Sequence, residues 1–192
     1  SYNDVTQIIA GDSHTCFIRS DQSIWCRGTS RTSGKLGDGF MSPQAVPVYI
    51  NDSATDFTQI VSANSHNCAL KQGGTIKCWG TGSDGRLGNS LTENQVSPVS
   101  VTGITNATTI TSLTNTTCAV LSDQSAKCWG FGGNGRLGNN STNSSSVPVL
   151  VSGLSGIAEL SAGGHLTCAR KSDNTIWCWG YGANYRLGNG DT

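Results

Sequence analysis

The stretch of sequence that decides the fold runs from His66 to Gly80 and reads His66-Asn-Cys68-Ala-Leu-Lys-Gln-Gly-Gly-Thr-Ile-Lys-Cys78-Trp79-Gly80. The chain has 192 residues and contains four versions of this stretch that align without gaps. The first cysteine of each version lies at Cys16, Cys68, Cys118 or Cys168. These positions show that the sequence repeats about every 50 residues. The sequence therefore divides into four units, the last one incomplete, which cover approximately residues 7–50, 59–101, 109–151 and 158–192.

Two further markers recur in constant phase with the cysteines. A cation precedes Leu-Gly in every unit, at Lys35, Arg86, Arg136 and Arg186. A Pro-Val element follows in the first three units, at Pro47, Pro98 and Pro148. Three markers in one phase identify a true internal repeat, which makes a single repetitive architecture the expected fold.

Within a unit, the sequence predicts four short strands. In the second unit these cover residues 59–63, 67–71, 75–79 and 96–101. Pro98 cannot donate a hydrogen bond to a sheet, so the last strand should lie at a sheet edge or start with the proline. No segment shows the 3.6-residue periodicity of a helix. Units of about 50 residues with four strands and a Trp-Gly ending are typical of the blades of an all-β propeller.

The pattern resembles the regulator of chromosome condensation repeat. That repeat reads Gly-x-x-His-Thr-x-Ala-Leu, a hairpin, Trp-Gly, Gly-x-Leu-Gly and Pro-Val-x-Val. Residues 11–48, 62–101 and 112–151 fit it, and residues 162–190 fit its first two thirds. The resemblance implies a β-propeller, usually of seven blades. The chain departs from the pattern in having four repeats, Lys or Arg where the family usually has Gln before Leu-Gly, and two additional cysteines per repeat.

The fourth unit stops before its Pro-Val strand. We therefore expect residues 1–192 to form a single propeller domain or a segment of a larger propeller, and a compact four-bladed ring or an assembly between chains is the alternative. An unfinished blade would expose the edge of a strand. Self-association through that edge is a further expectation.

The cysteines predict one disulfide per unit. Each unit has a C-x9-C spacing, which places the two cysteines opposite each other across a hairpin, close enough for a disulfide. Each link would stabilise the fold by roughly 2–3 kcal/mol on the chain-entropy model. The alternative is four reduced, buried pairs. The predicted links, which imply an oxidising compartment, are Cys16–Cys26, Cys68–Cys78, Cys118–Cys128 and Cys168–Cys178.

Composition argues against several classes of function. Twelve Lys and Arg balance twelve Asp and Glu, so no broad positive field is available for nucleic acid. No apolar run approaches the length of a membrane span. His14 and His66 occupy equivalent positions that are Thr116 and Leu166 in the other units, which favours a structural role over a catalytic or metal-binding one. We expect no enzymatic activity, no catalytic residues, no metal and no cofactor.

Aromatic and cationic side chains provide a candidate binding surface. The recurring Trp79, Trp129 and Trp179 should pack between blades, whereas the irregular aromatics vary around that framework. The cations before Leu-Gly should line one rim, although each could instead bond to its own loop. Such residues are enriched at protein-binding hot spots. The candidate surface consists of Lys35, Arg86, Arg136, Arg186, Phe131, Tyr181 and Tyr185.

The expected function is a non-enzymatic, extracellular binding or structural module, secreted or displayed at a surface, that presents loops to a protein partner. Glycan binding through Phe131, Tyr181 and Tyr185 is an alternative, as is a filament subunit joined through the incomplete blade. A guanine-nucleotide exchange factor fits less well, because thiols stay reduced in the cytosol and nucleus. N-glycosylation sequons, suited to a secreted protein, occur at Asn51, Asn106, Asn115, Asn139, Asn140 and Asn143.

Overall fold

The computed structural model describes residues 3–30 and 32–190 and consists of four antiparallel sheets, which confirms the all-β blade architecture. The first three sheets each have four strands in simple sequential order. Blade 1 contains β1 (Val5–Ala10), β2 (His14–Arg19), β3 (Ile24–Gly28) and β4 (Gln44–Tyr49). Blade 2 contains β5 (Phe57–Ser62), β6 (His66–Lys71), β7 (Ile76–Gly80) and β8 (Gln95–Ser100). Blade 3 contains β9 (Ala107–Ser112), β10 (Thr116–Leu121), β11 (Ala126–Gly130) and β12 (Ser145–Leu150).

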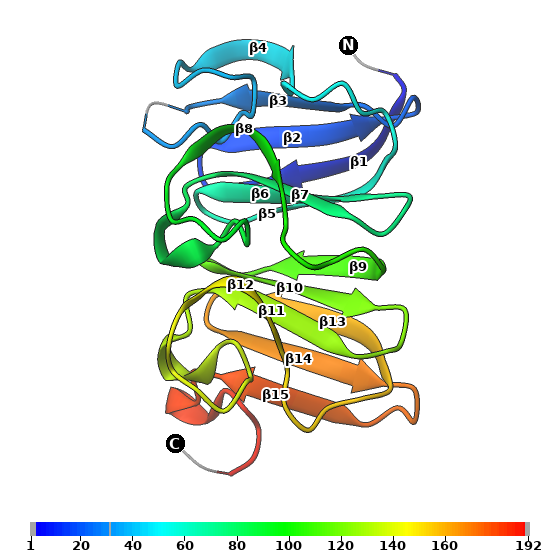
Figure 1. The fold of residues 1–192 in the computed structure, drawn as a ribbon, viewed down its shortest axis with the longest axis vertical. Helices are drawn as coiled ribbons and strands as arrows, with labels where there is room; N and C mark the ends of the chain where they lie inside the picture. Colours follow the sequence, from blue (N-terminus) through cyan, green and yellow to red (C-terminus); the bar gives the residue numbers. More distant parts are fainter. Residues whose placement is uncertain (1–2, 31, 191–192) are drawn as a thin grey trace.

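The fourth blade has three strands among the described residues: β13 (Ile157–Gly163), β14 (Leu166–Lys171) and β15 (Ile176–Gly180). The four sheets succeed one another along the long axis of the molecule (Figure 1). In the complete blades the Pro-Val strand is the outer edge of its sheet, as Pro98 in β8 predicted.

The inner strands of successive blades are joined by glutamine side chains. The Gln7 amide donates from Nε2 to the carbonyl of Ile60 at 3.1 Å and accepts from the Ile60 N–H at 2.9 Å. Gln59 makes the same pair of bonds to Ile110, at 3.0 and 2.9 Å. Each amide therefore acts as a short piece of strand backbone that links β1 to β5 and β5 to β9.

The four disulfides join the second and third strands of every blade, in the pairs that the C-x9-C spacing indicates. The paired cysteines are direct cross-strand partners with Cα atoms 4.0–4.1 Å apart. The first three disulfides are fully buried because the following blade covers them. The fourth, Cys168–Cys178, is partly exposed, since no described residue covers that face of blade 4.

The hydrophobic core lies between blades. At the junction of blades 1 and 2, Trp79 and Ala69 from the second blade pack against the Cys16–Cys26 disulfide of the first. The same positions are filled by Trp129 and Ala119 at the next junction. Trp79 and Trp129 have no exposed surface, which confirms their packing role. Burying a side chain of this size contributes several kcal/mol, so the tryptophans are main contributors to blade–blade cohesion.

Gly88 is required by this packing. Its φ of +67° lies in the left-handed region, and a β-carbon there would lie 2.8 Å from Nε1 of Trp129 in the next blade. Both the backbone and the neighbouring blade therefore exclude a side chain at this position.

The two equivalent histidines are structural, as the sequence indicates. The Nε2 atom of His14 is 2.7 Å from Oδ1 of Asn67, and that of His66 is 2.9 Å from Oγ1 of Thr117, so each ring reaches into the following blade. Burial lowers the pKa of His14. Burial, followed by the charges of Arg86 and His14, lowers the pKa of His66 to about 3. Both rings are therefore neutral at physiological pH.

Candidate functional site

A cation-bearing loop follows the third strand of each blade, and these loops occupy one side of the molecule. In blades 2 to 4 the loop contains a short 3₁₀ turn: η1 (Ser83–Gly85), η2 (Gly133–Gly135) and η3 (Ala183–Tyr185), on the left in Figure 1. The middle residue of each turn has nearly the same left-handed conformation, with φ of 60° at Asp84, 59° at Asn134 and 60° at Asn184. The three loops are therefore comparable position by position.

In blade 2 the loop cation is fully satisfied by its own blade. Arg86 is buried, and its Nη2 atom forms an ion pair with Oδ2 of Asp84 at 2.9 Å. Its Nε atom donates to the Ser83 carbonyl at 2.8 Å, and Nη1 donates to Oγ of Ser65 at 3.1 Å. The sequence places Arg86 in the candidate binding surface, and in the structure its side chain is buried and bonded to Ser83 and Asp84 of its own loop and to Ser65.

In blade 3 the loop cation has no carboxylate partner among the described residues. Arg136 is only 8% exposed, its Cζ atom lies 5.1 Å from the ring centroid of Phe131, and its Nη2 atom is 3.0 Å from Nδ1 of His165. Its Nε atom is buried without a partner. Burial lowers the pKa of this guanidinium. The side chain thus carries a charge that its immediate surroundings do not neutralise.

Blade 4 continues the arrangement at the surface. The ring of His165 meets that of Tyr181 edge to face, with centroids 6.1 Å apart, and Cζ of Arg186 lies 5.1 Å from the Tyr181 centroid. Arg186 is exposed. Two cations and three rings therefore form a continuous series of contacts from blade 3 to blade 4. We call this set the rim cluster, and its members are Phe131, Arg136, His165, Tyr181 and Arg186.

The remaining members of the predicted surface lie outside the rim cluster. Lys35 donates from Nζ to Oγ of Ser13 at 2.8 Å in blade 1. Tyr185, in η3, is 64% exposed and has a φ of 61°. The sequence interpretation missed His165, although it occupies the position of Ser13 and Ser65, which contact the loop cations of blades 1 and 2.

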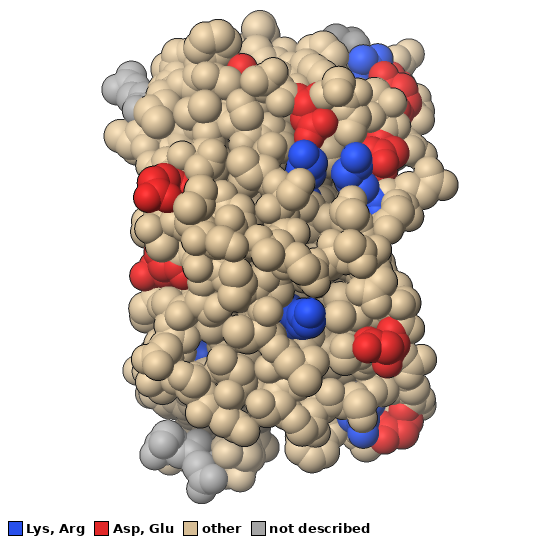
Figure 2. Space-filling model, viewed as in Figure 1, with Lys and Arg blue, Asp and Glu red and all other residues tan. Residues whose placement is uncertain are grey.

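Charges elsewhere on the molecule are mostly paired. Most of the face in Figure 2 is uncharged, and along one side Lys and Arg side chains stand beside Asp and Glu. The ion pairs include Lys71–Asp56 at 3.3 Å, Lys77–Asp52 at 3.6 Å and Arg170–Glu159 at 3.2 Å. The rim cluster differs from these regions in carrying cations without carboxylates among the described residues.

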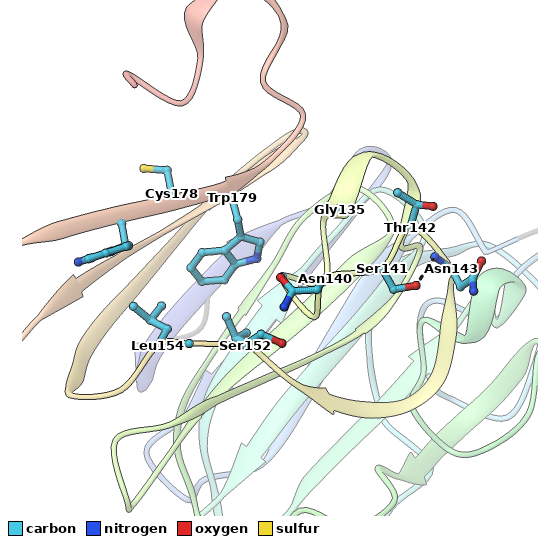
Figure 3. Close-up of a pocket in the computed structure, with 13 residues that line it drawn as sticks. Gly135, Asn140, Ser141, Thr142, Asn143, Ser152, Leu154, Cys178 and Trp179 are labelled. Carbon is cyan, nitrogen blue, oxygen red and sulfur yellow. Dashed lines mark hydrogen bonds between the residues drawn. The ribbon is translucent and has the colours of Figure 1, made fainter. Parts of the chain in front are cut away.

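A groove of about 600 Å³ runs beside β15, the strand with no outer neighbour among the described residues. One wall consists of Trp177, Cys178 and Trp179, and the other comes from the segments around Asn140 and Leu154 (Figure 3). Nearby Ile176 and Trp177 are 71% and 55% exposed. In blade 3 the equivalent space next to β11 is filled by β12, which pairs Val149 with Cys128.

The sequons differ in accessibility. Asn51, Asn106, Asn140 and Asn143 are exposed, whereas Asn115 and Asn139 are half-buried. Asn106 and Asn51 are held by hydrogen bonds from Nδ2 to Oγ of Ser122 and Ser97, at 3.1 and 3.0 Å. Within the described part of the chain there is no group of three potential metal ligands and no helix long and apolar enough to cross a membrane.

Comparison with known proteins finds similarity to one family of repeats. Two models of the regulator of chromosome condensation (RCC1) repeat match the chain, one over residues 57–86 and the other over residues 128–170. The X-linked retinitis pigmentosa GTPase regulator homolog of Caenorhabditis elegans is 35% identical over 86 residues, which cover 44% of this chain and 6% of that protein.

Solved structures share the fold at low sequence identity. Human WBSCR16 superposes with a TM-score of 0.81 and 19% identity, covering 92% of this chain and 47% of that one. The ectodomain of the receptor kinase CR4 from Physcomitrella patens has a TM-score of 0.62 and 18% identity, covering 92% of this chain and 41% of that one. The chain thus spans less than half the length of each of these three proteins.

Proposed function

Two stretches of the chain match models of the regulator of chromosome condensation repeat, and on this premise we propose that the chain is an extracellular, non-enzymatic propeller module that binds a protein partner. The rim cluster is the observation that carries the proposal. Arginine and tyrosine are the side chains most enriched at the centres of protein interfaces, because they combine a large rigid contact area with hydrogen bonds. Here they stand on loops that a rigid scaffold holds in place.

Two observations support the extracellular location. Four disulfides, one in each blade, are a typical feature of proteins from oxidising compartments. The similarity to a receptor-kinase ectodomain is consistent with such a scaffold. The exposed sequons Asn51, Asn106, Asn140 and Asn143 are then the proposed glycosylation sites, in preference to half-buried Asn115 and Asn139.

The proposal is tested by photo-crosslinking from the rim. Tyr185 is exposed next to the cluster, so we would replace it with benzoylphenylalanine in the intact protein and irradiate it in extracellular extract. A protein crosslinked from position 185, but not from the equally exposed control position Phe40 in blade 1, is expected. Capture should disappear in a Tyr181→Ala, Arg186→Ala double variant. Binding to a glycan array that depends on Tyr181 and Phe131, with no protein crosslink, would overturn the proposal in favour of glycan recognition.

A second candidate function is assembly through the β15 edge. Among the described residues no strand pairs with the outer edge of β15, and such an edge beside exposed Ile176 and Trp177 is a template for β-strand addition. The register of β12 on β11 predicts that a Val-Pro-Val segment would place its last valine opposite Cys178.

Light scattering of the 192-residue chain, with and without a peptide copying residues 145–152, tests assembly through this edge. Oligomers that dissociate when the peptide is added would support assembly through the β15 edge. A monomer whose melting temperature is the same with and without the peptide would contradict it. Gly135→Tyr provides a blocking variant. In blade 2 a β-carbon on the equivalent Gly85 would lie 2.2 Å from Ser146 of an outer strand, and Tyr185 shows that this loop position can adopt a left-handed conformation with a tyrosine.

A further inference from the structure

The loops of blades 2, 3 and 4 differ at one position that decides their charge. Asp84 occupies the left-handed position of the first loop, and Asn134 and Asn184 occupy it in the other two. The three residues share the left-handed conformation, with φ of 60°, 59° and 60° and ψ of 8°, 28° and 36°, so the side chain at this position leaves the backbone in a similar direction. The exchange of Asp for Asn therefore removes a carboxylate and leaves the cation.

The consequence is visible at Arg136. Arg86 has an ion pair at 2.9 Å, whereas Arg136 is more than nine-tenths buried and has a buried Nε atom without a partner. Its Nη2 atom lies 3.0 Å from Nδ1 of His165, and no carboxylate among the described residues pairs with it. A buried guanidinium is costly unless it is paired. An anion at the rim would supply the charge that Asp84 supplies in blade 2.

The surroundings of the site favour a bound carboxylate. Arg186 adds a second guanidinium that is exposed and, among the described residues, also has no carboxylate within ion-pair distance. Phe131 and Tyr181 lie against the two guanidinium groups and orient them. Planar guanidinium groups match carboxylates with two parallel hydrogen bonds. The chain has no net charge and therefore no broad positive field that would favour polyanions such as nucleic acid.

We propose that the rim cluster is a carboxylate-binding site that receives an acidic segment of a protein, with Arg136 and Arg186 pairing to its Asp or Glu side chains. This inference rests on the proposed function, because it names the chemistry of the partner that the rim engages. The His165 ring contacts Arg136 on one side and Tyr181 on the other, and it holds Arg136 in position.

The test places a carboxylate in the loops of blades 3 and 4 by substitution, at the position that Asp84 occupies in blade 2. Asn134→Asp and Asn184→Asp reproduce the residue that blade 2 accepts at φ of 60°, so they should leave the fold intact, as melting curves of each variant would verify. The probe is a fluorescein-labelled hexaglutamate peptide, whose anisotropy is measured with the full chain at two salt concentrations. We expect each substitution to weaken binding about tenfold, the effect of losing one charge-assisted contact.

Two controls sharpen the result. Arg170→Gln removes an exposed cation of blade 4 that is already paired with Glu159, and it should leave peptide binding unchanged. Asp84→Asn frees Arg86 and should tighten binding. Unchanged affinity in both Asn→Asp variants would overturn the inference, and so would tighter binding of heparin than of hexaglutamate.

The outcomes separate this inference from the proposed function. If a protein is still crosslinked from position 185 in the Asn134→Asp, Asn184→Asp double variant, the rim binds a partner but not through carboxylates. The opposite result is that hexaglutamate binds more weakly to the Asn→Asp variants, as expected, while no protein is captured. In that case the carboxylate site is supported and the proposed role as a protein-binding module is contradicted.

Discussion

The indole Nε1 of Trp79 donates a hydrogen bond to the backbone carbonyl of Lys35 at 3.1 Å, across the junction between blades 1 and 2. Trp179 makes the same bond, also at 3.1 Å, to the carbonyl of Arg136 across the junction between blades 3 and 4. Trp79 and Trp179 therefore each cover the disulfide of the preceding blade and fix the loop that carries that blade's cation. Trp129 packs in the same way, but its Nε1 atom is buried without a partner among the described residues. At these two junctions, blade packing positions the loop that carries the cation.

Trp79→Ala should lower the free energy of unfolding by about 3–5 kcal/mol, because it removes a fully buried ring and leaves a cavity at a blade junction. Arg27 is the matched control, since it occupies the same position in blade 1 and is exposed. Arg27→Ala should change stability by less than about 0.5 kcal/mol. Denaturant unfolding of both variants measures the difference, and equal destabilisation would contradict the junction role of the tryptophan.

The four disulfides should differ in their accessibility to reductant. Cys168–Cys178 is partly exposed, whereas the other three have no exposed surface. Mild reduction of the native protein followed by alkylation should label Cys168 and Cys178 first, as peptide mass mapping would show. Links between different blades in the unreduced protein, or uniform labelling of all eight cysteines, would be inconsistent with the structure.

Gly88→Val should destabilise the protein far more than Ser144→Val. A valine at position 88 must adopt a φ of +67° and would collide with Trp129, whereas Ser144 is exposed in the segment before β12. The expected loss at Gly88 is at least about 2 kcal/mol. Melting temperatures provide the comparison, and similar values for the two variants would contradict the steric argument.

Stability should fall as the pH drops below about 6.5, the ordinary pKa of a histidine. The pKa of His66 is lowered to about 3 in the folded protein. Between that pH and about 6.5, the histidine therefore binds a proton in the unfolded chain but not in the folded one. The penalty for this one group approaches about 1.4 kcal/mol per pH unit until its folded-state pKa is reached. Urea unfolding at pH 7 and pH 5 measures it.

His66→Thr is the control for that measurement, because Thr116 fills the equivalent buried position in blade 3. The variant should lose most of the dependence on pH between 7 and 5, with a remainder from His14, whose pKa burial also lowers. A variant that loses stability with acid as steeply as the original protein would show that other groups are responsible.

The repeat could be predicted in detail, because its signals are local. Opposite cysteines in a hairpin, Pro98 in an outer strand and glycines in tight loops depend on residues close in sequence. The rim cluster could be predicted only in part. The residue types at Phe131, Arg136, Tyr181 and Arg186 can be read from the sequence, but whether the charge of each arginine is paired depends on which side chain reaches its guanidinium.

Contacts between blades account for what the sequence did not reveal. Arg86 and Arg136 occupy equivalent positions in the sequence. In the structure Arg86 forms an ion pair with Asp84, whereas Arg136 contacts His165 of the following blade. The glutamine links at Gln7 and Gln59 were likewise not foreseen, because neither periodicity nor turn chemistry indicates a side chain that bonds to a strand about 50 residues away.

Those glutamine links also set the order in which the blades should come apart. Thr109 occupies, at the junction of blades 3 and 4, the position that Gln7 and Gln59 occupy at the first two junctions. Its side chain is too short to form the two hydrogen bonds that each glutamine makes to the next inner strand. In a repeat array each unit is held by its neighbours alone, so the weakest junction defines where local unfolding begins. Backbone amides of β13 to β15 should therefore exchange with deuterium before those of blades 1 to 3. This gradient would make blade 4 the most adaptable of the four blades and would give His165, Tyr181 and Arg186 of the rim cluster freedom to adjust to a ligand.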